Sequence, residues 1–404
     1  MKHPKSVIII GGGIVGASVA YFLTQEGIQV NLFERDECAC GTTAKNTGVV
    51  DLVSRTPDQQ MAITLESRRL YKVLLKILPR AFLFEERGSI MILAEGTEGT
   101  PSQLETCVRG MKALGVGAEL LEPAEVKRRV PELGVETLGG LFCPIGTLVS
   151  AQAAARALLE GAARAGALIR EREPVVKILT AGGGIKGVKT EKGEYRADGV
   201  VLAAGVWSPR VTEGLGLEFP ILPRRGQVLV TGEIGPVSQY LIWSADYILQ
   251  MLQGGGEKTS VGGKPQIGCD ETTLPGFLHS FSFQQHPGGS CYLGSTREFA
   301  GFEETVTDRG RETILQSAKR WFPALSNVPL ARSFAGLRPW TPDHHPLIGP
   351  SARVDGLWYA TGHEGDGVTL APITGKIIAE LIRGKTPELS GVDLSRYLPA
   401  RMDL

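Results

Sequence analysis

The chain has 404 residues, of which 42% are hydrophobic, enough for a sizeable core divided between two or three domains. Its 43 basic and 43 acidic residues cancel, which argues against recognition of nucleic acid or an anionic membrane through bulk charge. Glycine, with 52 residues, is roughly twice as frequent as its usual ~7%, but it has no period, which excludes collagen-like and low-complexity chains.

The first predicted elements form a strand–turn–helix–strand unit. A buried strand is predicted at Ser6–Ile10, a helix at Ala17–Gln25 and a second strand at Gln29–Phe33. The turn Gly11–Gly16 between the first strand and the helix matches the G-x-G-x-x-G pattern, and Glu34 ends the second strand. This context predicts a dinucleotide site; the alternative is a tight turn in an α/β domain without a ligand.

Each of these residues has a physical role in such a site. Gly11 permits the tight turn, Gly13 lets the backbone approach a pyrophosphate, and Gly16 lets helix and strand pack closely. Glu34 lies near the usual ~20-residue spacing and can accept hydrogen bonds from a ribose diol. The motif alone does not distinguish FAD from NAD.

The same apolar stretch, residues 7–23, raises the question of a signal peptide or membrane anchor. Four glycines fall inside it, and no small-residue cleavage site follows it. No other stretch approaches the ~20 apolar residues of a membrane span. We therefore expect a cytoplasmic protein without an integral membrane segment.

The segment Gly41–Val50 is polar and rich in small residues. Thr42, Thr43 and Asn46 offer hydroxyl and amide groups, and Lys45 offers a cation, as an extended FAD with a pyrophosphate would need. The alternative for this segment alone is an ordinary solvated loop.

Two later glycine positions follow predicted strands. The strand Asp198–Ala204 ends at Gly205, and the strand Leu357–Thr361 leads through the loop Gly362–Gly367 into a helix at Val368–Ile382. Backbone N–H groups at a helix N-terminus would stabilise the negative charge of a reduced flavin. The alternative for the second loop is a structural turn.

Together and in order, these segments resemble the flavoprotein family of D-amino acid oxidase, glycine oxidase and sarcosine oxidase. The resemblance covers nearly the whole chain and includes the stretches 223–227, 335–343 and 360–368. The chain looks most similar to flavin subunits of bacterial dehydrogenases that act on hydroxyproline, proline and opines. No second G-x-G-x-x-G and no C-x-x-x-x-C pair is present, which opposes the pyridine nucleotide–disulfide class.

The resemblance implies an α/β fold in which a Rossmann-like FAD-binding domain is interleaved with an α+β, antiparallel-sheet substrate domain. The FAD-binding domain would combine residues 1–76, 146–222 and 329–404, and the substrate domain residues 77–145 and 223–328. The cofactor would be noncovalent FAD, because the cysteine that anchors flavin in monomeric sarcosine oxidase has no clear counterpart. A metal at Cys38 and Cys40 lacks further ligands, and free thiols are expected there.

The resemblance implies FAD contacts from both ends of the chain. It places the backbone of Val175 against the adenine, although from its own pattern Val175 reads as core. The expected cofactor-binding residues are Gly11, Gly13, Ile14, Val15, Gly16, Glu34, Arg35, Thr42, Thr43, Lys45, Asn46, Gly48, Val49, Val175, Ala204, Gly205, Trp207, Arg338, Gly362, His363, Glu364, Gly365, Asp366, Gly367 and Val368.

Arg338 is the main candidate for substrate binding. It lies in an apolar, glycine-flanked setting, where a buried cation needs an anionic partner, and its planar fork fits a carboxylate. The resemblance implies that it binds the α-carboxylate of the substrate; the alternative is a structural salt bridge. Arg297 is a candidate second anionic contact, or a surface residue, and Tyr247 is a candidate aromatic of the pocket, or core. His363 is a candidate catalytic group, or a packing residue.

The predicted activity is FAD-dependent oxidation of the C–N bond of a small amino acid or secondary amino acid to an imine, by hydride transfer from Cα. The alternatives are a flavin-carrying electron-relay subunit without activity of its own and a NAD-dependent dehydrogenase. Other subunits, a homo-oligomer and a second flavin at a subunit interface are compatible with the resemblance. The glycine-rich region 253–276 has no assigned role.

Overall fold

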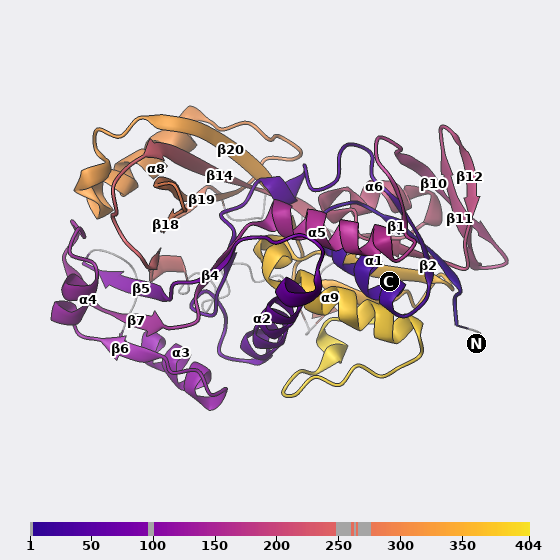
Figure 1. Ribbon diagram of the computed structural model, residues 1–404, viewed down its shortest axis with the longest axis horizontal. Helices are drawn as coiled ribbons and strands as arrows, with labels where there is room; N and C mark the ends of the chain where they lie inside the picture. The colour runs from indigo at the N-terminus through magenta and orange to yellow at the C-terminus, as the bar shows by residue number, and fades with distance from the viewer. Residues whose placement is uncertain (1–2, 96–100, 248–259, 262–263, 266–275) are drawn as a thin grey trace.

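The computed structural model describes residues 3–95, 101–247, 260–261, 264–265 and 276–404, and two large sheets dominate it. Figure 1 shows the elements around β1 and α1 on one side of the molecule and those around β5, β7 and β20 on the other. The glycine-rich region 253–276 lies almost wholly outside the described residues.

A six-stranded sheet has the order β21-β22-β13-β1-β2-β9, and every pairing is parallel except β21 with β22. The strands are β1 (Ser6–Ile10), β2 (Gln29–Phe33), β9 (Leu168–Arg170), β13 (Gly199–Leu202), β21 (Leu347–Pro350) and β22 (Leu357–Thr361). Helices α1 (Ile14–Gln25), α5 (Ala151–Arg164), α9 (Gly367–Ile382) and α2 (Gln59–Ile77) pack beside it. Because helices and other elements cover both faces, β1 is apolar on both.

An eight-stranded, mainly antiparallel sheet has the order β20-β14-β19-β18-β15-β5-β7-β6. Its strands are β5 (Ser89–Ala94), β6 (Glu119–Leu121), β7 (Thr137–Cys143), β14 (Leu222–Glu233), β15 (Leu241–Ser244), β18 (Leu278–Gln285), β19 (Ser290–Phe299) and β20 (Leu330–Trp340). Its helices are α3 (Pro101–Ala113), α4 (Pro123–Arg129) and α8 (Asp308–Trp321). The stacked rings of Phe281 and Trp321, with centroids 4.9 Å apart, join β18 to α8.

Smaller elements complete the described chain. Three short sheets contain β10 (Val175–Ala181), β11 (Gly184–Thr190) and β12 (Gly193–Arg196); β3 (Val49–Val50), β8 (Thr147–Val149) and β4 (Phe84–Glu86); and β16 (Ser260–Val261) and β17 (Lys264–Pro265). The short helices are α6 (Ser208–Thr212) and the 3-10 turns η1 (Thr42–Ala44), η2 (Gly205–Trp207), η3 (Glu213–Leu215), η6 (Pro323–Leu325), η7 (Glu364–Asp366), η8 (Leu394–Arg396) and η9 (Pro399–Met402). None of the described helices is long and apolar enough to cross a membrane.

The α/β class with a parallel and an antiparallel sheet is confirmed, and several strands have the predicted bounds. The strands at 6–10, 29–33 and 357–361 end where the sequence pattern places them. The first helix begins at Ile14 rather than Ala17, because Gly13 already acts as its N-cap. β20 pairs with β14 up to Trp340, inside the segment assigned to the FAD-binding domain, and the domain bounds stay a prediction.

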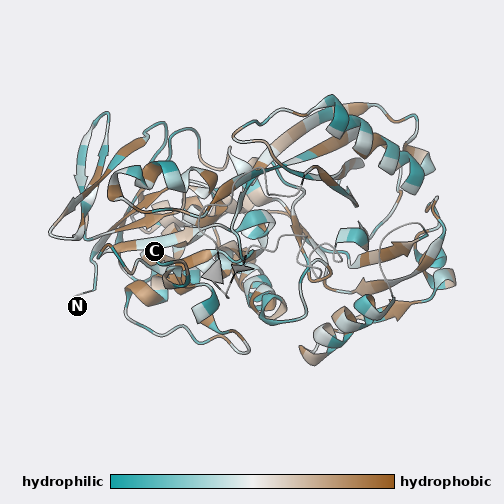
Figure 2. Ribbon diagram, turned by 180° about the vertical axis from the view of Figure 1, so that it is seen from behind, coloured by the Kyte–Doolittle hydropathy of each residue, from teal (hydrophilic) through white to brown (hydrophobic). Residues whose placement is uncertain are grey.

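The hydrophobic colouring in Figure 2 follows the strands of both sheets, where the core lies. One cluster packs α1, α5 and α9 against the parallel sheet, and a second packs α8 against the antiparallel sheet. Such apolar burial is the main driving force for this fold.

A tyrosine on α2 supplies a hydrogen bond that a proline removes from α9. Pro372 lies inside α9 and has no N–H, so the carbonyl of Val368, four residues before it, lacks its helical donor. The hydroxyl of Tyr71, which is fully buried, donates to that carbonyl at 2.6 Å. α2 therefore holds the first turn of α9 in place, where Gly367 and Val368 line the cavity described below.

Tyr71→Phe should lower the free energy of unfolding by about 1 to 2 kcal/mol, because it leaves the Val368 carbonyl buried without a donor. The measurement is urea unfolding followed by circular dichroism. Tyr240→Phe is the matched control, since the described residues offer no hydrogen bond to the Tyr240 hydroxyl, and it should cost less than about 0.5 kcal/mol. Equal effects of the two substitutions would contradict this account of α9.

Candidate active site

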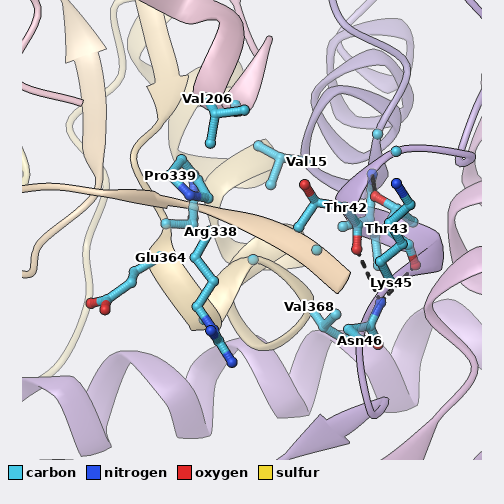
Figure 3. Close-up of a pocket in the computed structure, with 18 of the residues that line it drawn as sticks. Val15, Thr42, Thr43, Lys45, Asn46, Val206, Arg338, Pro339, Glu364 and Val368 are labelled. Carbon is cyan, nitrogen blue, oxygen red and sulfur yellow. Dashed lines mark hydrogen bonds between the residues drawn. The ribbon is translucent and has the colours of Figure 1, made fainter. Parts of the chain in front are cut away.

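A cavity lies where the carboxyl ends of β1, β13 and β22 meet the face of the antiparallel sheet. Its volume is about 370 Å³, within the range of ligand pockets. In a mainly parallel sheet, this end of the strands is where ligands bind. Figure 3 shows side chains from both ends of the chain around one space.

The N-terminal glycine turn forms a cradle that has no room for side chains. Gly11 has φ +112°, and an added Cβ there would overlap the Ala203 carbonyl; a Cβ on Gly16 would overlap the carbonyl of Gly11. The Glu34 carboxylate accepts from the backbone N–H of Gly12 at 2.7 Å. The turn, the start of α1 and the acid at the end of β2 thus have the arrangement that a dinucleotide requires.

The polar loop after β2 is held by its own side chains. Thr43 Oγ1 accepts from the Ile14 N–H at 3.0 Å, and Asn46 Nδ2 donates to the Thr43 carbonyl at 2.6 Å (Figure 3). Thr42 Oγ1 donates to the carbonyl of Leu337 on β20 at 2.9 Å. Lys45 forms an ion pair with Glu304. These bonds bring the loop to the cavity and connect it to the antiparallel sheet.

The second glycine loop, between β22 and α9, carries a buried carboxylate. Glu364 accepts from Arg224 Nη1 at 2.7 Å and contacts His344 Nδ1 at 3.0 Å. Burial alone would raise the pKa of Glu364, but His344 and Arg224 hold it well below the usual range. The ion pair therefore ties this loop to β14.

Two other residues of this loop have their side chains bonded within the protein. Asp366 forms a partly buried ion pair with Arg55, and its carboxyl does not line the cavity. His363 lines the cavity, but its Nε2 lies 2.9 Å from Thr374 Oγ1 on α9. Burial lowers the pKa of His363 to about 3, so the imidazole is neutral near pH 7. This arrangement is typical of a residue that positions the loop, and a catalytic role for His363 stays a prediction.

Arg338 extends from β20 into the cavity (Figure 3). Its Nη1 donates to the carbonyl of Thr296 at 3.1 Å and its Nη2 to Ser295 Oγ at 3.3 Å. Burial, and then the neighbouring charge of Arg297, lower the pKa of Arg338 to about 10, which leaves it charged near pH 7. Among the described residues, no carboxylate forms an ion pair with it. The guanidinium is therefore poised to bind an anion from outside the protein.

Most of the predicted site residues lie together around this cavity. The predicted residues that line it are Gly11, Gly13, Ile14, Val15, Glu34, Arg35, Thr42, Thr43, Lys45, Asn46, Ala204, Gly205, Trp207, Tyr247, Arg297, Arg338, Gly362, His363, Glu364, Gly365, Gly367 and Val368. The guanidinium of Arg35 lies 3.9 Å from the ring of Trp207, and that of Arg297 lies 4.1 Å from the ring of Tyr247.

Five predicted cofactor residues do not line the cavity: Gly16, Gly48, Val49, Val175 and Asp366. Gly16 acts through the close approach of α1 to the glycine turn, and Gly48 packs against the carbonyl of Val149. Val175 begins β10, and its side chain packs against the cluster around Ile8 and Phe33. The contact between Val175 and adenine stays a prediction.

Sequence reasoning assigned no role to Arg55, Arg224 or Ser295. Arg55 and Arg224 hold the second glycine loop through Asp366 and Glu364. The pairing of Arg224 with Glu364 spans 140 residues, and no local pattern connects them. Ser295 lies on β19 and Arg338 on β20, and the two residues meet because β14 pairs with both strands.

Comparisons with known proteins agree with this geometry. The family described as FAD dependent oxidoreductase (DAO) matches residues 6–381. A glycine oxidase of Pseudomonas aeruginosa is 27% identical over 400 residues, covering 98% of this chain and 99% of that protein. The crystal structure of a glycine oxidase from Bacillus cereus has a TM-score of 0.79 at 25% identity, covering 96% of each chain. That of an L-proline dehydrogenase from P. horikoshii has a TM-score of 0.81 at 24% identity, covering 97% of this chain and 96% of that one.

Gly16→Ala should prevent tight binding of the dinucleotide, because the new Cβ pushes α1 away from Gly11. We expect the purified variant to lose most of its visible flavin absorbance and about 1 to 3 kcal/mol of stability. Gly214→Ala, at a site with open space around the Cβ, is the control and should retain flavin. Full flavin content in Gly16→Ala would refute this role of the turn.

Glu364→Gln should make the free energy of unfolding depend less on pH in the acidic range. Because the folded-state pKa of Glu364 is depressed from the ordinary 4.5, its ion pairs stabilise the protein above that pH and are lost as pH falls through the folded-state value. The variant should therefore be less stable by on the order of 2 kcal/mol at pH 7, with a difference that shrinks below pH 4.5. Thermal unfolding across pH measures it, with the exposed Glu388→Gln as control. A difference that is constant with pH would contradict the ion-pair account.

Proposed function

The chain belongs to the DAO family of FAD-dependent oxidoreductases, and on that premise we propose that it oxidises the C–N bond of a small amino acid or secondary amino acid. The observation that carries the proposal is the guanidinium of Arg338, which is charged, lines the cavity and lacks a carboxylate among the described residues. The glycine oxidase relatives, which span nearly the full chain, support an amino acid as substrate.

Arg338 would bind the substrate carboxylate through its planar fork. The carbonyl of Thr296 and the hydroxyl of Ser295 hold the guanidinium in a fixed position, so a bound carboxylate takes a defined orientation. Orientation of the reacting carbon in this way lowers the entropic part of the barrier. When bound, FAD supplies the acceptor for the hydride that leaves the Cα atom.

The chain supplies no free base in the described lining of the cavity. The carboxylates of Glu34, Asp36, Glu304 and Glu364 and the imidazole of His363 each have a bonding partner in the protein. We therefore propose that the amine binds in its neutral form and that no side chain removes its proton. The products would be a protonated imine and reduced cofactor, and water would hydrolyse the imine.

The FAD-binding residues proposed here are those that line the cavity near the glycine turn, the polar loop and the start of α9. Backbone N–H groups at the N-terminus of α9 favour negative charge on a reduced cofactor. The support for this role is geometric, since Gly362 and Gly365 line the cavity just before the helix and Gly367 lines it as the first residue of the helix.

Arg338→Met should raise the substrate concentration needed for half-maximal flavin reduction by at least about a hundredfold, because it removes the charged partner of the carboxylate. FAD should remain bound. The measurement is anaerobic bleaching of the flavin spectrum with D- and L-amino acids, sarcosine, proline and hydroxyproline. Arg332→Met, an exposed arginine of the same strand, is the matched control and should behave as the wild type.

Two outcomes of this experiment would count against the proposal. Near-normal substrate affinity in Arg338→Met would remove Arg338 from the substrate site. A wild-type flavin that stays oxidised with every amine would favour the alternative of an electron-relay subunit without activity of its own.

A further inference from the structure

We propose that the cavity binds an amine with two carboxylates, the first on Arg338 and the second on Arg297. This inference rests on the proposed amine oxidation and names its substrate class. It comes from the charges that face the cavity and from the partners each of them has.

Arg297 is a buried cation that forms no ion pair with a carboxylate of the described residues. It lies on β19, is only 6% exposed and lines the cavity. Its Nη1 is buried and has no hydrogen-bond partner, and among the described residues no carboxylate pairs with the guanidinium. The guanidinium lies 4.1 Å from the ring of Tyr247. A ring face attracts a cation, but it leaves the N–H donors of Nη1 unbonded.

The strand explains why Arg297 and Arg338 face the same space. Side chains alternate along a strand, so Ser295 and Arg297 point to one face and Thr296 to the other. Thr296 Oγ1 accepts from the backbone N–H of Gln227 on β14, and Ser295 bonds to Arg338 in the cavity. β19 therefore holds Arg338 through the Thr296 carbonyl and the Ser295 hydroxyl, and it places Arg297 in the same cavity.

The carboxylates in the described lining of the cavity form no ion pair with these two arginines, because each has another partner, although the charge of Glu364 attracts both guanidiniums. Backbone N–H groups of Gly12 and Asp36 bind Glu34, Arg35 binds Asp36, Lys45 binds Glu304, and Arg224 and His344 bind Glu364. In the described part of the lining, Arg297 and Arg338 are the two cations left without an ionic partner. Burial of such a charge is costly, so the site is arranged for an anionic ligand.

The number of charges indicates a dianion. A neutral amine with one carboxylate would form an ion pair with Arg338 and leave Arg297 buried without one, whereas a second carboxylate would give each arginine an ion pair. Both guanidiniums line the same cavity, and their mutual repulsion contributes to the lowered pKa of Arg338. The second carboxylate could lie on the nitrogen substituent, as in iminodiacetate, or on the side chain, as in glutamate.

The test compares each diacid with its neutral isostere in the FAD-loaded protein. The pairs are iminodiacetate with its monoamide, and D- or L-glutamate with the matching glutamine. Binding is followed by calorimetry and by the perturbed flavin spectrum, without oxygen, so that affinity is measured apart from turnover. We expect one diacid to bind at least about tenfold more tightly than its isostere, as a charge-assisted bond predicts. The pair that shows this preference locates the second carboxylate.

Arg297→Met should reduce the ratio of the two affinities to near one. Arg297→Gln, which keeps a polar group, provides a second variant if the first does not fold, and thermal unfolding verifies both. Arg332→Met, at an exposed site in the same sheet, should keep the wild-type ratio.

The proposal is overturned if the wild type binds diacid and isostere alike, or binds neither diacid. It is also overturned if Arg297→Met weakens both ligands equally, because Arg297 would then serve the first carboxylate. Failure of the proposed function looks different: no amine bleaches the flavin, and Arg338→Met changes nothing. Bleaching by monocarboxylic amines without a preference for diacids would contradict this inference and leave the proposed function standing.

Discussion

The partly buried guanidinium of Arg338, which forms no ion pair with a described carboxylate, is the constraint on which the rest of this site depends. Such a cation is stable only if its N–H groups are bonded and an anion is available when the site is filled. The carbonyl of Thr296 and the hydroxyl of Ser295 provide the bonds. The fold leaves the position of the anion open, and this is the property that a carboxylate-binding enzyme requires.

The antiparallel sheet is built around that side chain. In the pairing of β14 with β20, Arg224 lies opposite Arg338, and Gly226 lies opposite Gly336. A Cβ on Gly226 would overlap the guanidinium of Arg338, so the glycine gives the arginine its space. The ion pair of Arg224 with Glu364 then joins this sheet to the loop that begins α9. This ion pair and the bond from Thr42 to the Leu337 carbonyl thus hold the substrate side and the cofactor side of the cavity together.

Much of the cofactor side could be predicted from the sequence, because its pattern is local. The glycine turn, Glu34 and the start of α9 each lie beside the strand that positions them, and the strand bounds came from short apolar runs. Arg338 could be singled out because a cation in an apolar, glycine-flanked segment is unusual. In contrast, the roles of Arg55, Arg224 and Tyr71 depend on partners about 300, 140 and 300 residues away, respectively. The lack of a partner for Arg297 is likewise a property of the packed cavity that its neighbours in sequence do not reveal.

The most direct test of the central claim is a crystal structure of the FAD-loaded protein with a carboxylic acid that lacks an amine and cannot react. The account predicts the carboxylate oxygens within hydrogen-bond distance of Arg338 Nη1 and Nη2, with the bonds to Thr296 and Ser295 retained. A carboxylate bound elsewhere in the cavity, or an Arg338 paired with a protein carboxylate, would contradict it.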